Sequence, residues 1–326
     1  MPLPGENERF FYTDLDRRIW EEELESFVPA KVFDAHTHIW SEANALPETR
    51  ENPLRFPVDA AAMLAWQRAL FPGRRLGFMM LGSPIPGIDF VADREWCVAE
   101  SKKLPDAVCG VLVTPQTDPA RLAADAERLG FRALKPYLVF AEHTVNSPIS
   151  ELIPESLVEV ADECGLMIVL HVSRPECFSD PENLRELEYF TKKYPRVVWQ
   201  LAHCARSFNS VLLERAISRL REIEPICYDL SAVCDPYTMY LLFRHEDRSR
   251  LMYGSDNVSA GALHGSYAPF ARNWGYYPAN DRRATFICYE QLRAMRRGAI
   301  MAEVTKEELE RIFWDNACRI YGLSTK

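Results

Sequence analysis

The sequence lacks an excess of basic residues and long apolar runs. Its 326 residues carry 38 Lys and Arg against 47 Asp and Glu, which gives a formal net charge of −9. This balance argues against nucleic acid as a main partner, because nucleic acid requires a basic face, and against docking on an anionic membrane. Apolar stretches such as residues 166–170 are far too short to span a bilayer.

Targeting signals and disulfide patterns are also missing. Residues 1–10 contain prolines and acids where a signal peptide requires basic residues followed by an apolar run. The nine cysteines include no CxxC pair, and a chain of this length does not require a disulfide framework. We therefore expect mostly buried, reduced thiols, including Cys204, in a cytoplasmic protein.

Eight short apolar runs recur along the chain, each followed by a polar loop and then by helix-like spacing. They cover residues 32–35, 76–81, 108–113, 132–135, 166–170, 197–202, 226–230 and 251–254. Most are continuously apolar, as expected of parallel strands covered on both faces. Eight strand–helix units in series predict an α/β fold, a (β/α)₈ TIM barrel, in a single domain of residues 1–326.

The segments between the runs are typical of helices. Residues 157–164 place apolar side chains on one face, and Gly165 follows as a C-terminal cap residue. Residues 120–129 end at Gly130, and residues 181–194 begin after Asp180, a plausible N-cap. A doubly wound sheet is the main alternative, but it requires a glycine-rich turn after the first strand, where this chain has histidines.

Three segments fall outside the eight units. Residues 14–27 predict an acidic helix within an N-terminal extension of residues 1–30, and long loops follow the first strand at 40–57 and the last at 256–284. Such loops are usually functional, and both follow strand ends on the face where barrel enzymes act. The second loop could form a lid or a contact in the homo-oligomer that we expect; its aromatic residues are Tyr267, Trp274, Tyr276 and Tyr277.

Four of the seven histidines end predicted strands. His36 and His38 end the first strand, His171 the fifth and His203 the sixth. Side chains two residues apart on a strand point to the same side, so the first two imidazoles can share one cation at the roughly 2.0–2.1 Å that zinc prefers. Alone, such a pair more often lies on a surface loop.

Two carboxylates complete this candidate site. Asp34 is in phase with the paired histidines and could orient a ligand. Asp256 lies just past the eighth strand, where a carboxylate can bind a metal and accept a proton from water, although an aspartate after Gly-Ser is also a common helix cap or turn residue.

The combination of these residues resembles the amidohydrolase superfamily, and within it the amidohydrolase-2 branch of metal-dependent hydrolases and non-oxidative decarboxylases. The resemblance extends from VFDAHTH, which contains the paired histidines, to DNACRIYGL at residues 315–323. It implies that His36, His38, His171 and Asp256 bind one divalent ion, Zn²⁺ or alternatively Mn²⁺. It also implies that His203 hydrogen-bonds the water on the metal and that Asp256 is the proton acceptor.

Four further residues are expected near the substrate. Lys135 ends the fourth strand; binuclear relatives carboxylate a lysine there as a metal bridge, and otherwise it would be a cation beside the metal site or the substrate. Arg174 and Arg206 each follow a site histidine by three residues and suit a substrate carboxylate, unless they form salt bridges with acids such as Glu176. Trp40 could form the floor of an apolar substrate pocket, or it could belong to the hydrophobic core.

The sequence contains no GxSxG elbow or P-loop. We expect a metal-dependent hydrolase of a small organic acid, lactone or amide that uses activated water. A metal-dependent decarboxylase is the alternative, because the same metal ligands would serve that reaction. A non-catalytic metal-binding barrel is the third hypothesis.

Overall fold

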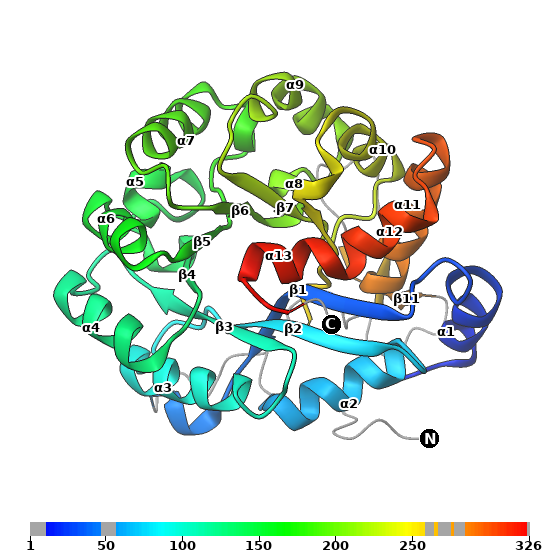
Figure 1. Cartoon of the computed structure of the whole chain (residues 1–326), viewed down its shortest axis with the longest axis horizontal. Coiled ribbons are helices and arrows are strands. Elements are labelled where there is room, and N and C mark those ends of the chain that lie inside the picture. The colour runs from blue at the N-terminus through cyan, green and yellow to red at the C-terminus, as the bar shows by residue number, and fades with distance from the viewer. Residues whose placement is uncertain (1–10, 47–56, 258–263, 267–274, 277–283, 325–326) are drawn as a thin grey trace.

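The computed structural model describes residues 11–46, 57–257, 264–266, 275–276 and 284–324, and their strands form a parallel sheet in the order β1 to β8. The strands are β1 Lys31–Ile39, β2 Arg75–Gly82, β3 Ala107–Val113, β4 Ala133–Pro136, β5 Met167–Leu170, β6 Trp199–Leu201, β7 Ile226–Asp229 and β8 Leu251–Met252. Each overlaps one predicted run. The TIM barrel is therefore confirmed (Figure 1).

Backbone hydrogen bonds close the barrel between its first and last strands. The amide of Ala35 donates to the carbonyl of Tyr253 at 2.9 Å, and the amide of Asp256 donates to the carbonyl of His36 at 2.8 Å. This closure brings Asp256 beside the paired histidines, although it follows His36 by 220 positions in the sequence.

Helices surround the sheet (Figure 1). The longer ones are α2 Ala60–Leu70, α3 Phe90–Ser101, α4 Pro119–Leu129, α6 Glu155–Cys164, α7 Pro181–Lys193, α9 Ser210–Leu220, α10 Pro236–His245 and α11 Ile287–Met301. Gly130 and Gly165 end α4 and α6 in the left-handed conformation, and the Asp180 side chain caps α7, as predicted. Shorter segments are η2 Glu42–Asn44, η4 Leu138–Phe140, η5 Thr144–Asn146, α5 Ile149–Leu152, η6 Cys177–Ser179, α8 Ala202–Arg206 and η7 Arg248–Arg250.

The predicted N-terminal helix is present as α1 Asp14–Ile19 followed by the π-helical turn η1 Trp20–Leu24. It is joined to the segment after β8, where β9 His264–Ser266 pairs with β10 Gly275–Tyr276 and β11 Thr285–Phe286. The fully buried Asp16 carboxylate accepts a hydrogen bond from Thr285 Oγ1 at 2.5 Å and lies 3.1 Å from His264 Nε2.

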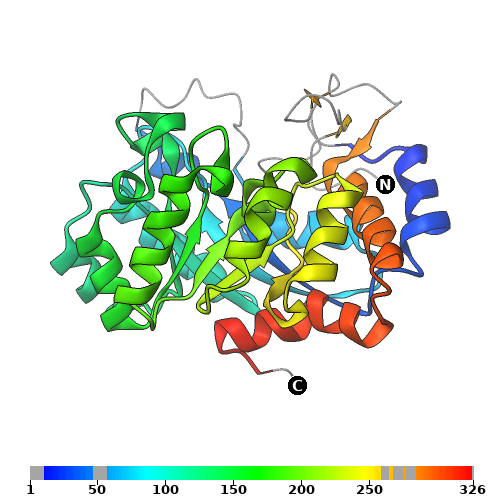
Figure 2. The ribbon, with the colours of Figure 1, turned by 90° about the horizontal axis from the view of Figure 1, so that it is seen from above.

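The C-terminal segments close one end of the barrel (red in Figure 2). They are α12 Lys306–Glu310, η8 Arg311–Asp315 and α13 Asn316–Tyr321. Trp314 and Tyr321 pack against Phe33 near the start of β1, with ring centroids 5.9 and 5.5 Å from that of Phe33. The carboxyl ends of the strands lie at the other end of the barrel, where the candidate site is found.

The cysteines agree with a reduced interior. All nine are free, and eight of them are buried; Cys164 is the exposed one. Among the described residues, no helix combines the length and the apolarity that crossing a membrane requires.

Candidate metal centre

The strand ends bring the predicted site residues to one end of the barrel. His36 and His38 lie on β1, His171 directly follows β5, His203 lies two residues after β6, and Asp256 follows β8. Their exposed fractions range from 0% for His36 to 9% for Asp256. The barrel thus gathers in its interior polar side chains that would ordinarily be solvated.

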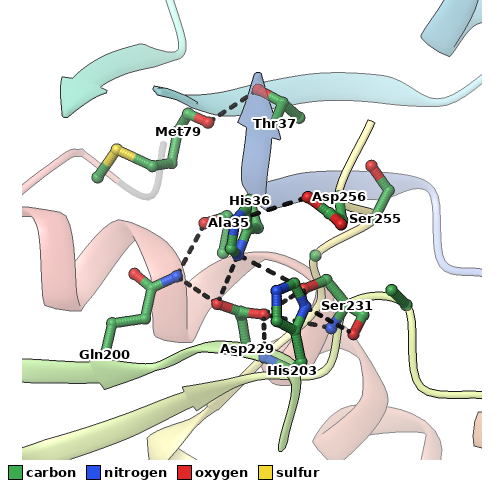
Figure 3. A network of polar contacts seen from close by, with 12 residues as sticks. Ala35, His36, Thr37, Met79, Gln200, His203, Asp229, Ser231, Ser255 and Asp256 are labelled. Carbon is green, nitrogen blue, oxygen red and sulfur yellow. Dashed lines mark hydrogen bonds and ion pairs between the residues drawn. The ribbon is translucent and has the colours of Figure 1, made fainter. Parts of the chain in front are cut away.

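Three of these residues form the tightest group. One ligand atom from each of His36, His203 and Asp256 lies within 4.8 Å of the other two (Figure 3). The other two predicted ligands adjoin this group. His38 Nε2 is 3.3 Å from Asp256 Oδ1, and the His171 ring centroid is 5.1 Å from that of His203. The structure therefore places His203, expected to contact water, among the candidate ligands themselves.

Hydrogen bonds at Nδ1 determine which nitrogens face the centre. His36 Nδ1 is 3.0 Å from Asp229 Oδ2, and His38 Nδ1 is 3.0 Å from the carbonyl of Gly82. Because ionised carboxylate and carbonyl oxygens only accept, Nδ1 carries a proton in both rings. Their Nε2 lone pairs then point to Asp256 Oδ1, which lies 3.7 Å from His36 Nε2.

This donor set fits a divalent cation. Two imidazole lone pairs and a carboxylate oxygen face one another with no proton to share, and His36 Nε2 is buried without a hydrogen-bond partner among the described residues. Leaving such groups unpaired in the interior is costly. Imidazole and carboxylate are ligands that Zn²⁺ and other divalent transition metals accept.

The electrostatics hold these ligands in their binding forms. Burial lowers the pKa of His36 to about 4, although the charge of Asp229 opposes the shift. Burial alone would raise the pKa of Asp256, but the neighbouring imidazoles of His38, His203 and His36 outweigh burial and lower it to about 2. At neutral pH the site therefore presents a neutral imidazole and an ionised carboxylate.

Asp229, the last residue of β7, is a central residue that the sequence reasoning missed. Its fully buried carboxylate accepts hydrogen bonds from His36 Nδ1, from Gln200 Nε2 at 2.7 Å, and from the amide of His203 at 3.0 Å. The Ser231 amide and hydroxyl also donate to it. Burial would raise the pKa of Asp229, but His36, His203 and these donors hold it well below its usual range. In the sequence, the position of Asp229 at the end of an apolar strand could have indicated this role.

His203 stands in an unusual backbone turn. Four consecutive residues from His203 to Arg206 have φ between 53° and 60°, in the left-handed region. None is glycine, so the turn carries backbone strain, which is often found at functional sites. Hydrogen bonds maintain it, because the Ser207 amide donates to the His203 carbonyl at 3.0 Å. Cys204 in this turn is fully buried and burial raises the pKa of its thiol, which agrees with a packing role.

Lys135 is a buried cation beside this group. Its side chain is fully buried on β4, and its Nζ has no hydrogen-bond partner among the described residues. Burial lowers the pKa of Lys135 to about 8, against the opposing charges of Asp229 and Asp256. Nζ lies 5.6 Å from the centre of the Tyr137 ring, and that ring adjoins His171 at 4.9 Å between centroids.

The two arginines differ in their partners. Arg174 forms ion pairs with Asp180 at 3.2 Å and Glu182 at 2.5 Å, which favours the structural alternative, although with acids other than Glu176. Arg206 instead donates through Nη1 to the carbonyls of Val172 at 3.0 Å and Arg174 at 3.3 Å, on the loop after His171. This anchoring leaves its other guanidinium nitrogens without a protein partner in the described part of the chain.

The remaining predicted residues lie further out or outside the described residues. Trp40 is 3% exposed and belongs to an apolar cluster with Ile85, Ile88 and Leu112. Tyr267, Trp274 and Tyr277 fall outside the described residues, and Tyr276 is described only as part of β10.

Solved structures share this fold at low sequence identity. A 4-oxalomesaconate hydratase from Rhodopseudomonas palustris has 16% identity and a TM-score of 0.57, with 89% of this chain and 95% of that one covered. A probable 2-pyrone-4,6-dicarboxylic acid hydrolase from Acinetobacter baumannii, with citric acid bound, has 13% identity and a TM-score of 0.58 over 90% and 99%.

A third structure contains a metal. It is a 5-carboxyvanillate decarboxylase from Novosphingobium aromaticivorans with bound manganese, at 14% identity and a TM-score of 0.55 over 92% of this chain and 98% of that one. No curated protein sequence matches the chain. The amidohydrolase-2 family model matches residues 33–323, nearly the whole chain. The strand-end histidines, Asp256 and this match agree: the chain belongs to the amidohydrolase-2 family of the amidohydrolase superfamily.

Proposed function

We propose that this protein is a metal-dependent hydrolase that acts on a small organic acid, lactone or amide. The observation that carries this proposal is the convergence of unprotonated ligand atoms from His36, His38 and Asp256, with His203 in the same group. A catalytic metal site requires a few protein ligands with neutral imidazoles and an ionised carboxylate, and the lowered pKa values of His36, His203 and Asp256 favour those forms.

One divalent ion per chain would be held by His36, His38, His171 and Asp256, with His203 beside them or as a further ligand. Zn²⁺ suits the imidazole-rich set, and Mn²⁺ is a possible substitute, since a structural neighbour contains manganese. Such an ion acts as a Lewis acid that acidifies water and polarises a carbonyl oxygen.

The protein's own groups would move the proton. Asp256 is ionised at neutral pH and can accept a proton from the attacking water. It can then return that proton to the leaving group as the scissile bond breaks. His203, fixed through Nδ1 to Ser231, would orient the water during the attack.

Local cations favour an anionic substrate. The chain carries a net charge of −9, so a negatively charged substrate requires positive groups near the reacting atoms. Lys135 and Arg206 provide them, whereas Arg174 is paired with acids. Two of the structural neighbours are named for carboxylic acid substrates, which supports this choice. Trp40 would contribute apolar packing near the site.

Decarboxylation is the alternative reaction, because a neighbour of the same fold is a decarboxylase. In that case the bond between the substrate carboxylate and its carbon breaks and CO₂ leaves. Asp256 or His203 takes up a proton from solvent and transfers it to the resulting carbanion.

A panel of small acids, lactones and amides in ¹⁸O-labelled water distinguishes these reactions. Hydrolysis incorporates ¹⁸O into the product, and this is the result we expect. CO₂ release without ¹⁸O uptake selects the lyase. Addition of water without bond cleavage would indicate a hydratase, and absence of turnover with every metal-loaded form would favour the non-catalytic barrel.

A further inference from the structure

Asp229 contacts Nδ1 of His36, and Ser231 contacts Nδ1 of His203 (Figure 3). Asp229 Oδ2 lies 3.0 Å from His36 Nδ1. The Ser231 carbonyl oxygen lies 3.2 Å from His203 Nδ1, and its hydroxyl oxygen lies 2.9 Å from the same nitrogen. Two residues at the end of one strand therefore hold two imidazoles that come from β1 and from the turn after β6.

The direction of each hydrogen bond follows from what the partners can donate. The Ser231 hydroxyl makes a short hydrogen bond to Asp229 Oδ1, and an ionised carboxylate can only accept, so the single hydroxyl proton is used there. Ser231 Oγ thus presents a lone pair to His203 Nδ1. The Ser231 carbonyl also only accepts. The proton between them therefore belongs to His203 Nδ1.

From this geometry we propose that Asp229 and Ser231 are a positioning pair that fixes His36 and His203 as Nδ1–H tautomers and leaves both Nε2 lone pairs available to a cation. The inference rests on the proposed metal function. It assigns His203 Nε2 as a ligand or a proton acceptor, and it excludes this nitrogen of the neutral ring as a hydrogen-bond donor to the substrate.

The surroundings of Asp229 keep the pair in place. Gln200 Nε2 donates to Asp229 Oδ2 at 2.7 Å and to the Ala35 carbonyl at 3.0 Å, while Gln200 Oε1 accepts from the Tyr321 hydroxyl at 2.7 Å. The amide is thereby fixed as a donor to the carboxylate. The backbone amide of His203, at the start of the left-handed turn, also donates to Asp229 Oδ1, so the same carboxylate contacts the turn that carries this ring.

Nitrogen NMR on the metal-free wild-type protein tests the assignment directly. Long-range ¹H–¹⁵N spectra of histidine-labelled protein distinguish the two tautomers, and single His→Gln variants assign each ring. We expect His36 and His203 to carry the proton on Nδ1. His38, held by a backbone carbonyl, serves as the internal reference for that form. An Nε2–H ring at His36 or His203 would overturn the inference, and this measurement requires no variant of the pair to fold.

Metal affinity provides the second readout. In Asp229→Asn the new amide can donate to His36 Nδ1, so the ring proton is expected to move to Nε2. The Kd for Zn²⁺, measured by competition with a chelator, should then rise by roughly 10- to 100-fold. Asp93→Asn is the matched control, since Asp93 is a buried carboxylate on α3 outside the site; its Kd should equal that of the wild type.

The outcomes separate this inference from the proposed function. A wild-type protein that binds neither Zn²⁺ nor Mn²⁺ overturns the proposed function, even if both rings are Nδ1–H. A metal-binding wild type whose Asp229→Asn variant keeps the same Kd and the same tautomers overturns the positioning role alone.

Discussion

At the scale of single residues, the site depends on which atoms carry protons. Nδ1 of each β1 histidine is occupied by an acceptor, so each Nε2 is free to bind, and Asp256 remains ionised because its imidazole neighbours outweigh the effect of burial. The same carboxylate can therefore serve as a ligand and as a base.

Asp256→Asn separates these two roles. The amide keeps the shape and one ligand oxygen but loses the basic carboxylate. We expect most of the metal to be retained while kcat falls by roughly 10²-fold or more, the scale of general-base catalysis. Elemental analysis and steady-state kinetics check this on the same preparation. Near-normal turnover would show that Asp256 is not the proton acceptor.

The arginines provide a matched pair of substitutions. Arg206→Met should raise KM for an anionic substrate by roughly 10- to 100-fold, the scale of a lost charge-assisted hydrogen bond, with the metal retained. Arg174→Met should lower the melting temperature more than it changes KM, because its guanidinium is paired with Asp180 and Glu182. The reverse pattern would assign the substrate carboxylate to Arg174.

At the scale of elements, close helix packing supports the barrel wall beside the site. Gly298 lies in α11 against α10, and a Cβ there would come within 2.6 Å of Met239 Cβ and 2.9 Å of the Tyr240 amide nitrogen. The neighbouring α10 follows the Ser231 turn that holds His203. The packing of α10 against α11 therefore lies close in the chain to the site.

Gly298→Ala should destabilise the protein despite the higher helix propensity of alanine. Propensity favours the substitution by about 1 kcal/mol, but overpacking against the α10 backbone typically costs about 1–3 kcal/mol. Chemical denaturation should show a lower unfolding midpoint. Ile300→Ala on the same helix, at a side chain that is 67% exposed, should change stability by about 0.5 kcal/mol or less. A more stable Gly298→Ala variant would contradict the packing argument.

The eight strands and several helix caps were predictable because they depend on local patterns. Continuous apolar runs mark strands covered on both faces, and Gly130, Gly165 and Asp180 occupy positions where single residues determine helix ends. The left-handed turn at His203 could not be predicted, because its residues have no intrinsic preference for positive φ and distant hydrogen bonds maintain it. The function of Asp229 also depends on residues far away in the chain, including His36.

At the scale of the whole molecule, one end of the barrel is packed by the C-terminal helices and the other carries the site, while buried charges are placed throughout. Asp93 on α3 is 1% exposed, and its Oδ1 has no hydrogen-bond partner among the described residues. Burial raises the pKa of Asp93 to about 7, and the hydrogen bonds from Cys97 and Asn44 and the charge of Arg94 offset only part of that shift. This carboxyl therefore makes global stability depend on pH.

The sign of that dependence follows from the raised pKa. The folded protein binds the Asp93 proton more tightly than the unfolded chain, so the contribution to stability is full below the unfolded pKa near 4 and is lost as pH rises towards 7. Asp93→Asn removes this loss. Measured by urea unfolding, the free energy of unfolding of the variant should rise relative to that of the wild type by about 2 kcal/mol between pH 5 and pH 8. A constant difference between the two proteins across this range would contradict the assigned pKa.

The most direct test of the central claim is the metal content of the protein purified without chelators. We expect roughly one tightly bound divalent ion per chain, Zn²⁺ or Mn²⁺, held through His36, His38, His171 and Asp256 beside His203. A His36→Ala, His38→Ala double variant that remains folded should lose this ion. The absence of any ion in the wild-type protein, even after supplementation with zinc or manganese, would contradict the account.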